Sequence, residues 1–502
     1  MTYKHGIEVM EKETSFPSPA STKYGVQVIF GTAPVHLAKE PGKAVNQPVK
    51  AASFEEAKEK LGYSDDWERY SLCQSMYASF QLFQINPVIF VNVLDPQKHT
   101  TDLMKTEYAV EDHQIVIEEM GVLKDTLTVS AQLGRSYTGT AKAGESKVAE
   151  RSSELKEETD YIADFDDTGK LVLTLLRTGT AYDVKNLMVS GKALSPEMVT
   201  EEDMIGAYEV ETGKETGIEV LRQVYPKYGL IPGVLMAPGW SHKPNVGAAL
   251  QGKCEDICGA FRCTCLLDLD TSQTKTYTDV EKAKNEAGYD ESHSVVLWPM
   301  VTVGGKRCWY SAVYGAMMSY QTASNQDVPY LYPSNKPLYT DGACLEDGTE
   351  VLLDQVQAGV LNGFGVVTAF HDTQWKSYGN NMGCYPGVTD PKDRWIGCRR
   401  MFDYVANYFV TEYRSRLDEN MNKRLIDDIV NSFNIWGNGL VSSGMCAGLS
   451  AEYRSEENTM EDVLAGHLRI RIYFAPYTPA EYIKATMEFD VSALEAGMGQ
   501  EG

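Results

Sequence analysis

Short apolar runs alternate with helix-type patterns in two separate stretches of the sequence, and this alternation limits the possible folds most strongly. Residues 23–94 have a strand–helix–strand order, and residues 216–380 contain further strands and helices in alternation. Strands that are apolar at nearly every position are buried on both faces, as in a parallel or mixed sheet covered by helices. We therefore predict one discontinuous α/β domain with a mixed sheet, to which both stretches contribute.

The section between these stretches, residues 95–215, has a different character. Its short runs alternate between apolar and polar residues, which is typical of strands with one exposed face. The turn at 166–169 predicts a hairpin. The section has 13 Lys and Arg residues against 25 Asp and Glu residues, within a chain whose net charge is −24. We predict a β-rich, acidic inserted domain that is displayed to solvent.

The last section, residues 390–480, begins with two long helical patterns at about 397–416 and 421–436. A strand pattern follows at 467–474, so we predict a small C-terminal α+β domain. Another alternating run, at 482–491, predicts a strand within a C-terminal arm that spans residues 481–502.

The N-terminal arm, residues 1–22, also contains an alternating run, in which Ile7 and Val9 follow Gly6 and point to the same side. Pro17 and Pro19 then exclude a helix and interrupt any ladder of hydrogen bonds. A strand on such a tether has two possible partners, a distant strand of its own chain or the open edge of a neighbour's sheet. Fully extended at about 3.3 Å per residue, the arm could reach roughly 70 Å. A frayed terminus is the alternative interpretation.

The composition excludes several classes of protein. The chain has 502 residues, of which 43% are hydrophobic, so it can form several packed domains. Its 46 basic residues against 70 acidic residues argue against binding to nucleic acid or anionic lipid. The longest apolar runs have the length of strands, so we expect no membrane insertion. The sequence begins without a charged-then-apolar signal segment, so we expect assembly in the cytoplasm without export.

Ten cysteines raise the question of a metal site. Only Cys254, Cys258, Cys263 and Cys265 lie close together, and their spacing differs from the paired spacing of structural zinc sites. Free cysteine is among the most frequently buried residue types, so we interpret these side chains as part of the core. We expect neither a metal ion nor a cofactor.

Motifs for catalysis are incomplete in this sequence. His371 beside Asp372 is the best candidate for a general base with its orienting group, although a surface turn is the commoner role for such a pair. An acidic α/β enzyme with a β-rich insert is therefore the alternative hypothesis, and we predict that the chain has no catalytic residues.

Positive charge is concentrated between Arg394 and Arg424, where seven basic residues face four acidic ones. Arg399 and Arg400 begin a helix, where the helix dipole disfavours cations, which favours a role for them outside the helix. Arg414 and Arg416 follow near its end. The charge pattern alone leaves two interpretations open for these four arginines, contact with an acidic protein partner or a solvated face of an amphipathic helix.

Three segments resemble the tail sheath proteins of contractile phage tails and related contractile injection systems. They are residues 5–9 with the Pro-rich tether, residues 28–37 with the sequence Phe-Gly-Thr-Ala-Pro, and residues 469–481. The order of the sections agrees with this family: an N-terminal arm, an α/β domain, a variable insert on the outer surface, and a C-terminal α+β domain that faces the inner tube.

The resemblance implies a structural protein rather than an enzyme. Copies would polymerise helically around an inner tail tube and contract by rigid-body rearrangement, in a virion tail or a similar particle. The resemblance implies that N- and C-terminal arms add strands to neighbouring subunits, and baseplate and tail terminator proteins are the further partners. The residues of the arms that we expect to link subunits are Gly6, Ile7, Val9, Ile483, Phe489 and Val491, and the tube-facing residues are Arg399, Arg400, Arg414 and Arg416.

Overall fold

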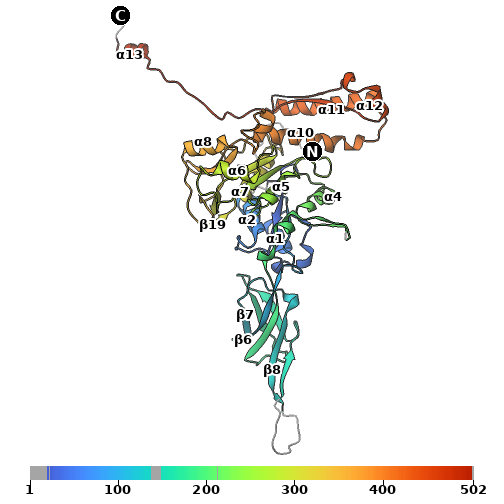
Figure 1. Ribbon diagram of the computed structural model, residues 1–502, viewed down its shortest axis with the longest axis vertical. Helices are drawn as coiled ribbons and strands as arrows, with labels where there is room; N and C mark the ends of the chain where they lie inside the picture. The colour runs from blue at the N-terminus through green and yellow to red at the C-terminus, as the bar shows by residue number, and fades with distance from the viewer. Residues whose placement is uncertain (1–19, 22, 137–148, 212, 500–502) are drawn as a thin grey trace, which may run out of the picture.

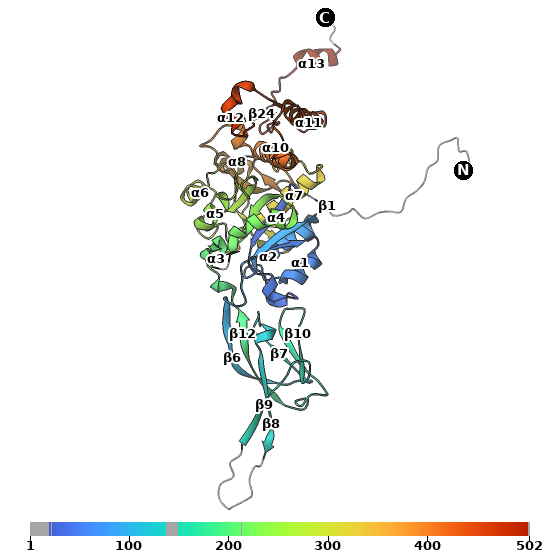
Figure 2. The ribbon, with the colours of Figure 1, turned by 90° about the vertical axis from the view of Figure 1, so that its right-hand side faces the viewer.

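The computed structural model describes residues 20–499, apart from residues 22, 137–148 and 212. The molecule is elongated: the α/β domain occupies the middle, the insert projects from one end and the C-terminal domain lies at the other (Figures 1 and 2). The C-terminal arm extends away from the body (Figure 1). The predicted linking strand of Gly6, Ile7 and Val9 lies outside the described residues.

A mixed eight-stranded sheet forms the α/β domain, as predicted. Its six central strands are parallel, and one antiparallel strand forms each edge. Both sequence stretches contribute strands, in the order β22 (Trp375–Tyr378), β21 (Val366–His371), β17 (Ser294–Leu297), β16 (Thr264–Asp268), β15 (Pro232–Met236), β2 (Val26–Gly31), β5 (Val88–Asn92) and β3 (Pro48–Ala51).

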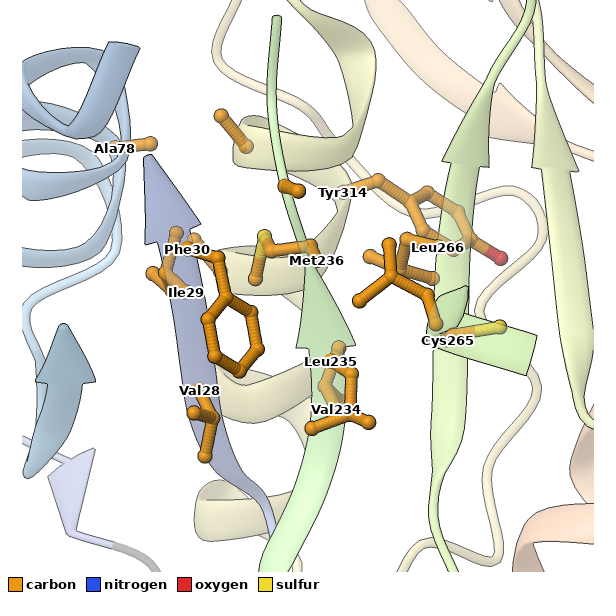
Figure 3. Packing of buried hydrophobic residues seen from close by; sticks show 14 of the residues in the cluster. Val28, Ile29, Phe30, Ala78, Val234, Leu235, Met236, Cys265, Leu266 and Tyr314 are labelled. Atoms are coloured by element: carbon orange, nitrogen blue, oxygen red, sulfur yellow. The ribbon is translucent and has the colours of Figure 1, made fainter. Parts of the chain in front are cut away.

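The central strands are buried on both faces because helices pack against the sheet. Ile29 of β2, Met236 of β15 and Leu266 of β16 are fully buried at matched positions on neighbouring strands, and Tyr314 of α7 lies beside Leu266 (Figure 3). This burial explains why the strands have no polar alternation in the sequence.

The helices of this domain lie close to their predicted positions. Ser53 caps α1 by accepting a hydrogen bond from the Glu56 backbone N–H, and the Glu56 carboxylate accepts one from the Ala52 N–H, as in a capping box. The helices are α1 (Phe54–Leu61), α2 (Ser71–Tyr77), α3 (Glu201–Ile205), α4 (Val224–Tyr228), α5 (Pro244–Gln251), α6 (Val280–Ala287), α7 (Tyr310–Ser324) and α8 (Gln355–Gly363). None of the helices in the described part of the chain has the length and hydropathy of a membrane span.

The insert consists of two antiparallel sheets around a core of its own. The turn at 166–169 joins β10 and β11 as the predicted hairpin. One sheet has the order β6 (Thr100–Ala109), β12 (Asn186–Leu194), β8 (Thr128–Ser136), β9 (Ala149–Glu154), and the other has the order β10 (Tyr161–Phe165), β11 (Leu171–Leu175), β7 (Gln114–Ile117). The fully buried side chains between them include Ile117, Leu171, Leu173, Leu187 and Val189.

The insert is shorter than the predicted range 95–215. Its two ends meet where the Ser195 N–H donates to the His99 carbonyl at 3.0 Å. Beyond this point Val199 and Met204 are buried in the core of the α/β domain. The acidic residues after 195 made this stretch look like part of the insert, although its apolar side chains pack with the main sheet.

The C-terminal domain has the two predicted long helices, α10 (Ile396–Tyr413) and α11 (Lys423–Ser442). They enclose a separate core with a two-stranded sheet, β23 (Gly448–Glu452) and β24 (Arg471–Ala475). We did not predict β23, and the predicted strand at 467–474 begins only at Arg471. Short helices complete the domain, α9 (Pro391–Arg394) and α12 (Met460–Leu464).

The predicted strand at 482–491 is not a strand in this chain. Residues 482–490 have no secondary structure, and Val491 begins a helix, α13 (Val491–Gly497), which the Asp490 side chain caps. An alternating sequence forms a strand only beside a partner strand, and the described residues offer none here. The remaining short strands are β1 (Ala20–Ser21), β4 (Ile85–Asn86), β13 (Tyr208–Glu209), β14 (Lys214–Glu215), β18 (Met300–Val303), β19 (Lys306–Cys308) and β20 (Gly342–Cys344).

Candidate assembly site: an open sheet edge and its groove

The small sheet of the C-terminal domain is closed on one side only. On the β23 side, the Asn434 side chain of α11 donates to the Ala451 carbonyl at 3.0 Å and accepts from the Ala451 N–H at 2.7 Å. These two bonds occupy the outward backbone groups of Ala451. On the other side, β24 has no partner strand among the described residues.

The register of the sheet identifies the free backbone groups of β24. Ala451, whose groups point outward to Asn434, lies opposite Ile472. In an antiparallel ladder, outward-pointing pairs alternate with hydrogen-bonded pairs, so the N–H and C=O of Ile472 and Phe474 point to the open edge. An incoming strand could therefore bond to these residues without disturbing the existing ladder.

A groove of about 1280 Å³ runs beside the segment that leads into β24. Its apolar side chains come from α10, α11 and this segment, which is how an alternating strand could bury one of its faces. They are Phe409, Val410, Leu425, Ile429, Ile470 and Ile472.

Five arginines line this groove against three acidic residues, in a chain that is otherwise acidic. Arg414 and Arg416, which we predicted from the sequence, lie in the turn after α10 and are exposed. The Arg414 guanidinium lies 5.4 Å from the ring centre of Tyr225, and Arg416 pairs with Glu419 at 3.3 Å. The other arginines that line the groove are Arg262, Arg469 and Arg471.

The C-terminal arm has the opposite properties. Its large apolar side chains are exposed: Ile483 is 84% exposed, Phe489 76% and Val491 56%. After Glu481 the arm has one basic residue, Lys484, against four acidic ones. The arm therefore carries unburied apolar surface and negative charge, whereas the groove offers apolar surface and positive charge.

Arg399 and Arg400 do not belong to this surface, and their prediction as tube-facing residues is wrong for the described chain. They are only 4% and 6% exposed. Arg399 pairs with Asp403 at 3.0 Å and Asp393 at 2.9 Å, and Arg400 donates to the Thr322 hydroxyl at 2.8 Å. Burial lowers the pKa of Arg400 to about 10.

These two arginines instead connect α10 with the α/β domain. The imidazole of His293, just before β17, lies 3.2 Å from the Asp403 carboxylate that pairs with Arg399. The helix dipole argument failed because carboxylates three to six residues away, which the sequence does not mark as partners, neutralise the charges.

The carboxyl ends of the parallel strands are where an α/β enzyme would bind its substrate. A cavity of about 420 Å³ lies there, lined by His242 and Trp309, whose rings stack at 4.6 Å. Burial lowers the pKa of His242 to about 4. The arginines of the cavity are paired, Arg69 with Glu197 at 2.9 Å and Arg307 with Glu68. No arrangement of nucleophile, base and oxyanion donors is apparent in this cavity.

The other candidates for chemistry are structural. His371 is the last residue of β21, lies beside Trp375 and is exposed, and Asp372 pairs with Lys376 at 3.3 Å. Nine of the ten cysteines are buried, and only Cys258 is exposed. Within the described ranges, no group of three His, Cys, Asp or Glu side chains is arranged to hold a metal ion.

Comparisons with known proteins give the following relatives. No protein-family model matches the chain. A curated tail sheath protein of Burkholderia phage BcepMu is 24% identical over 518 residues, which cover 98% of this chain and 97% of that protein. A protein of Pseudomonas aeruginosa, named as a prophage major tail sheath protein, is 21% identical over 283 residues, or 54% of this chain and 68% of that protein.

Solved structures resemble the chain along nearly its whole length. The sheath complex of the extracellular contractile injection system PVC, in its contracted state, has a TM-score of 0.55 at 13% identity and matches 98% of this chain and 99% of that one. The contracted helical sheath of the anti-feeding prophage has a TM-score of 0.54 at 14% identity and matches 98% and 100%. These likenesses confirm the predicted combination of α/β and α+β architecture.

Proposed function

We propose, on the premise that this chain belongs to the tail sheath proteins, that it is the structural subunit of a contractile tail sheath. Copies polymerise helically around an inner tube and contract by rigid-body rearrangement. The observation that carries this proposal is that one chain contains both halves of a link: an open sheet edge at β24 and an exposed apolar arm that has no binding site in the described part of its own chain.

The link between subunits is strand addition. An arm of one subunit lies along β24 of another and bonds to the outward backbone groups of Ile472 and Phe474. Alternate side chains of the arm enter the groove between α10 and α11 and fix the register. Ile483, Phe489 and Val491 remain the candidates in the C-terminal arm, and Gly6, Ile7 and Val9 those in the N-terminal arm.

Charge supports the same pairing. Arg414 and Arg416 line the groove, so we assign them to contact with an acidic arm of a neighbouring subunit. Exposed ion pairs contribute about 0–1 kcal/mol each, but a helical assembly repeats them in every subunit. The inner tube, the baseplate and the terminator protein are further partners of the particle, and the tube is the partner that we assign to the C-terminal domain.

This function requires no catalytic site. New contacts between subunits supply the free energy of contraction, and the extended sheath is held by a kinetic barrier. The relatives are structural proteins of sheaths, and the cavity at the carboxyl ends of the strands is lined by paired charges, which gives the enzyme hypothesis no support.

Replacing Ile472 by proline tests strand addition. Proline removes the N–H that points to the open edge, whereas the ladder with β23 keeps its bonds. We expect a folded, soluble monomer that forms no sheath-like tubes in electron micrographs. The matched control Ile472→Val keeps both the N–H and an apolar side chain in the groove, and it should assemble. Normal tubes from Ile472→Pro, with an unchanged circular dichroism spectrum, would exclude this edge as the site of linkage.

A further inference from the structure

The helix at the end of the C-terminal arm, α13, has an apolar stripe with nothing to cover it. Val491, Leu494 and Met498 are spaced three and four residues apart and lie on one face of the helix. Their side chains are 56%, 49% and 66% exposed. Strand addition by residues 482–490 would leave this helix outside the sheet, so its stripe needs a binding surface of its own.

A matching surface lies on α8 of the α/β domain. Val356 and Val360 lie one turn apart on α8 and are 75% and 37% exposed, and Leu352, in the segment just before the helix, is 63% exposed. No charged residue occurs in α8, although 23% of the chain is charged. Gly359 lies on the same exposed side, and a β-carbon placed on it would meet no other atom within 4 Å. Another helix could therefore approach closely.

The root of the C-terminal arm is close to the end of α8. Glu481 pairs with Arg394 at 3.6 Å, Arg394 donates to the Asn381 side chain at 2.9 Å, and Asn381 donates to the Asn362 carbonyl in α8 at 3.0 Å. The chain from β24 to Glu481 thus runs from the groove to the end of α8. Figure 2 shows β24, α10 and α8 in the same part of the molecule.

This path predicts where the arm of another copy would end. Residues 482–490 span roughly 30 Å when extended, long enough to lie along the five residues of β24 and continue past its end. A donated segment that runs parallel to β24 therefore leaves the sheet beside the recipient's α8.

We propose that α13 of one copy docks on α8 of the copy that receives its arm, with Val491, Leu494 and Met498 against Leu352, Val356 and Val360. This inference rests on the proposed function and adds a second, helix–helix contact to the strand link. The interface is apolar on both sides, so the contact is driven by the hydrophobic effect and depends little on salt.

Cysteine cross-linking in assembled tubes tests the contact. In a Cys258→Ser background the remaining cysteines are buried, so a short bis-maleimide reacts with introduced cysteines. We expect Val360→Cys combined with Leu494→Cys to give a ladder of dimers and higher multimers on denaturing gels. The matched control combines Val360→Cys with Ala496→Cys, which lies on the opposite face of α13, and should remain monomeric.

The outcomes separate this inference from the proposed function. Tubes without a ladder, or equal ladders from both pairs, would overturn the docking of α13 on α8 and leave strand linkage standing. A cross-link within one chain would show that α13 folds back onto its own α8, which also overturns the proposal. If the wild-type chain assembles but the Cys258→Ser parent does not, the cross-link is repeated with Cys258 retained, and the single-cysteine variants serve as blanks. If the wild type itself forms no tubes, both proposals are overturned.

Discussion

The sheet of the α/β domain and the sheet of the C-terminal domain differ in whether both of their edges are closed within one chain. In the α/β domain, six parallel strands lie between two antiparallel edge strands, and helices bury both faces. In the C-terminal domain, β23 and β24 form a sheet of two strands with one open edge. Two strands alone are marginally stable in water, and this pair relies on α10 and α11 for its packing. The large sheet has its edge strands and covering helices within one chain, whereas we propose that assembly completes the small one.

The largest expected effect is on folding, and it compares two deletions that differ in whether they remove residues of the α/β core. Replacing residues 100–194 by a short Gly/Ser bridge should leave a folded protein, because the His99 carbonyl and the Ser195 N–H already meet. Replacing residues 96–214 should prevent folding, because Val199 and Met204 are lost from the main core. Soluble yield and circular dichroism measure both. Equal folding of the two variants would show that residues 195–214 contribute nothing to this core.

Matched substitutions of one residue type compare the two sheets directly. Phe30→Ala, at the centre of the large sheet, should lower the free energy of unfolding by about 3–5 kcal/mol. Phe474→Ala should cost the monomer about 1–2 kcal/mol, since Phe474 is only partly buried, against Phe402 at 4.9 Å. Urea unfolding gives both values. Phe474→Ala should also form clearly fewer tubes than the wild type. If Phe474→Ala assembles as well as the wild type, the role assigned to the small sheet is contradicted.

Two arginines of the C-terminal domain provide a similar contrast. Arg399→Ala should lower the free energy of unfolding by about 3–5 kcal/mol, because it leaves the buried carboxylate of Asp403 without its cation. Arg416→Ala should change it by about 0–1 kcal/mol, because its pair with Glu419 is exposed. Arg416→Ala should instead weaken assembly, most strongly at low salt. A large loss of monomer stability in Arg416→Ala would place this residue in the core instead.

The last of these effects depends on pH and on a single buried histidine. His36 is 6% exposed, and burial lowers its pKa to about 3, from an ordinary value of 6.5. The folded chain therefore binds fewer protons than the unfolded chain between these values, and stability falls as the pH falls. Between pH 7 and pH 5 we expect this group to cost about 2 kcal/mol. In His36→Leu this part of the pH dependence should disappear from urea unfolding curves, and an unchanged dependence would refute it.

The sequence predicted the regions in which local pattern and tertiary environment agree. The central strands were found because each is apolar throughout, and α1 because Ser53 and Glu56 form its cap. β23 was missed because Leu449 and Ala451 are its only buried positions, too short a run to stand out. The strand at 482–491 was predicted from alternation alone, and alternation cannot supply the partner strand that a ladder needs.

The candidate site was predictable only in part, for the same reason. Arg414 and Arg416 were predicted as tube-facing residues; they line the groove, and their contact with the tube stays a prediction. Arg399 and Arg400 gave the same charge signal in the sequence, yet they are buried. Their burial next to Asp403 depends on contacts between α10 and the rest of the molecule, which local charge does not reveal. The open edge of β24 had no signal in the sequence, since it is defined by which backbone groups remain unpaired after folding.

The hydrogen bonds between Asn434 and Ala451 have a consequence for the geometry of any polymer. In the proposed sheath they leave the C-terminal sheet one edge, at β24, at which a strand can be received, so successive links through this sheet all point the same way. A chain of such links has polarity and does not branch at this sheet. Removing the block, for example by Asn434→Ala, would create a second acceptor edge and with it the possibility of branched or disordered aggregates.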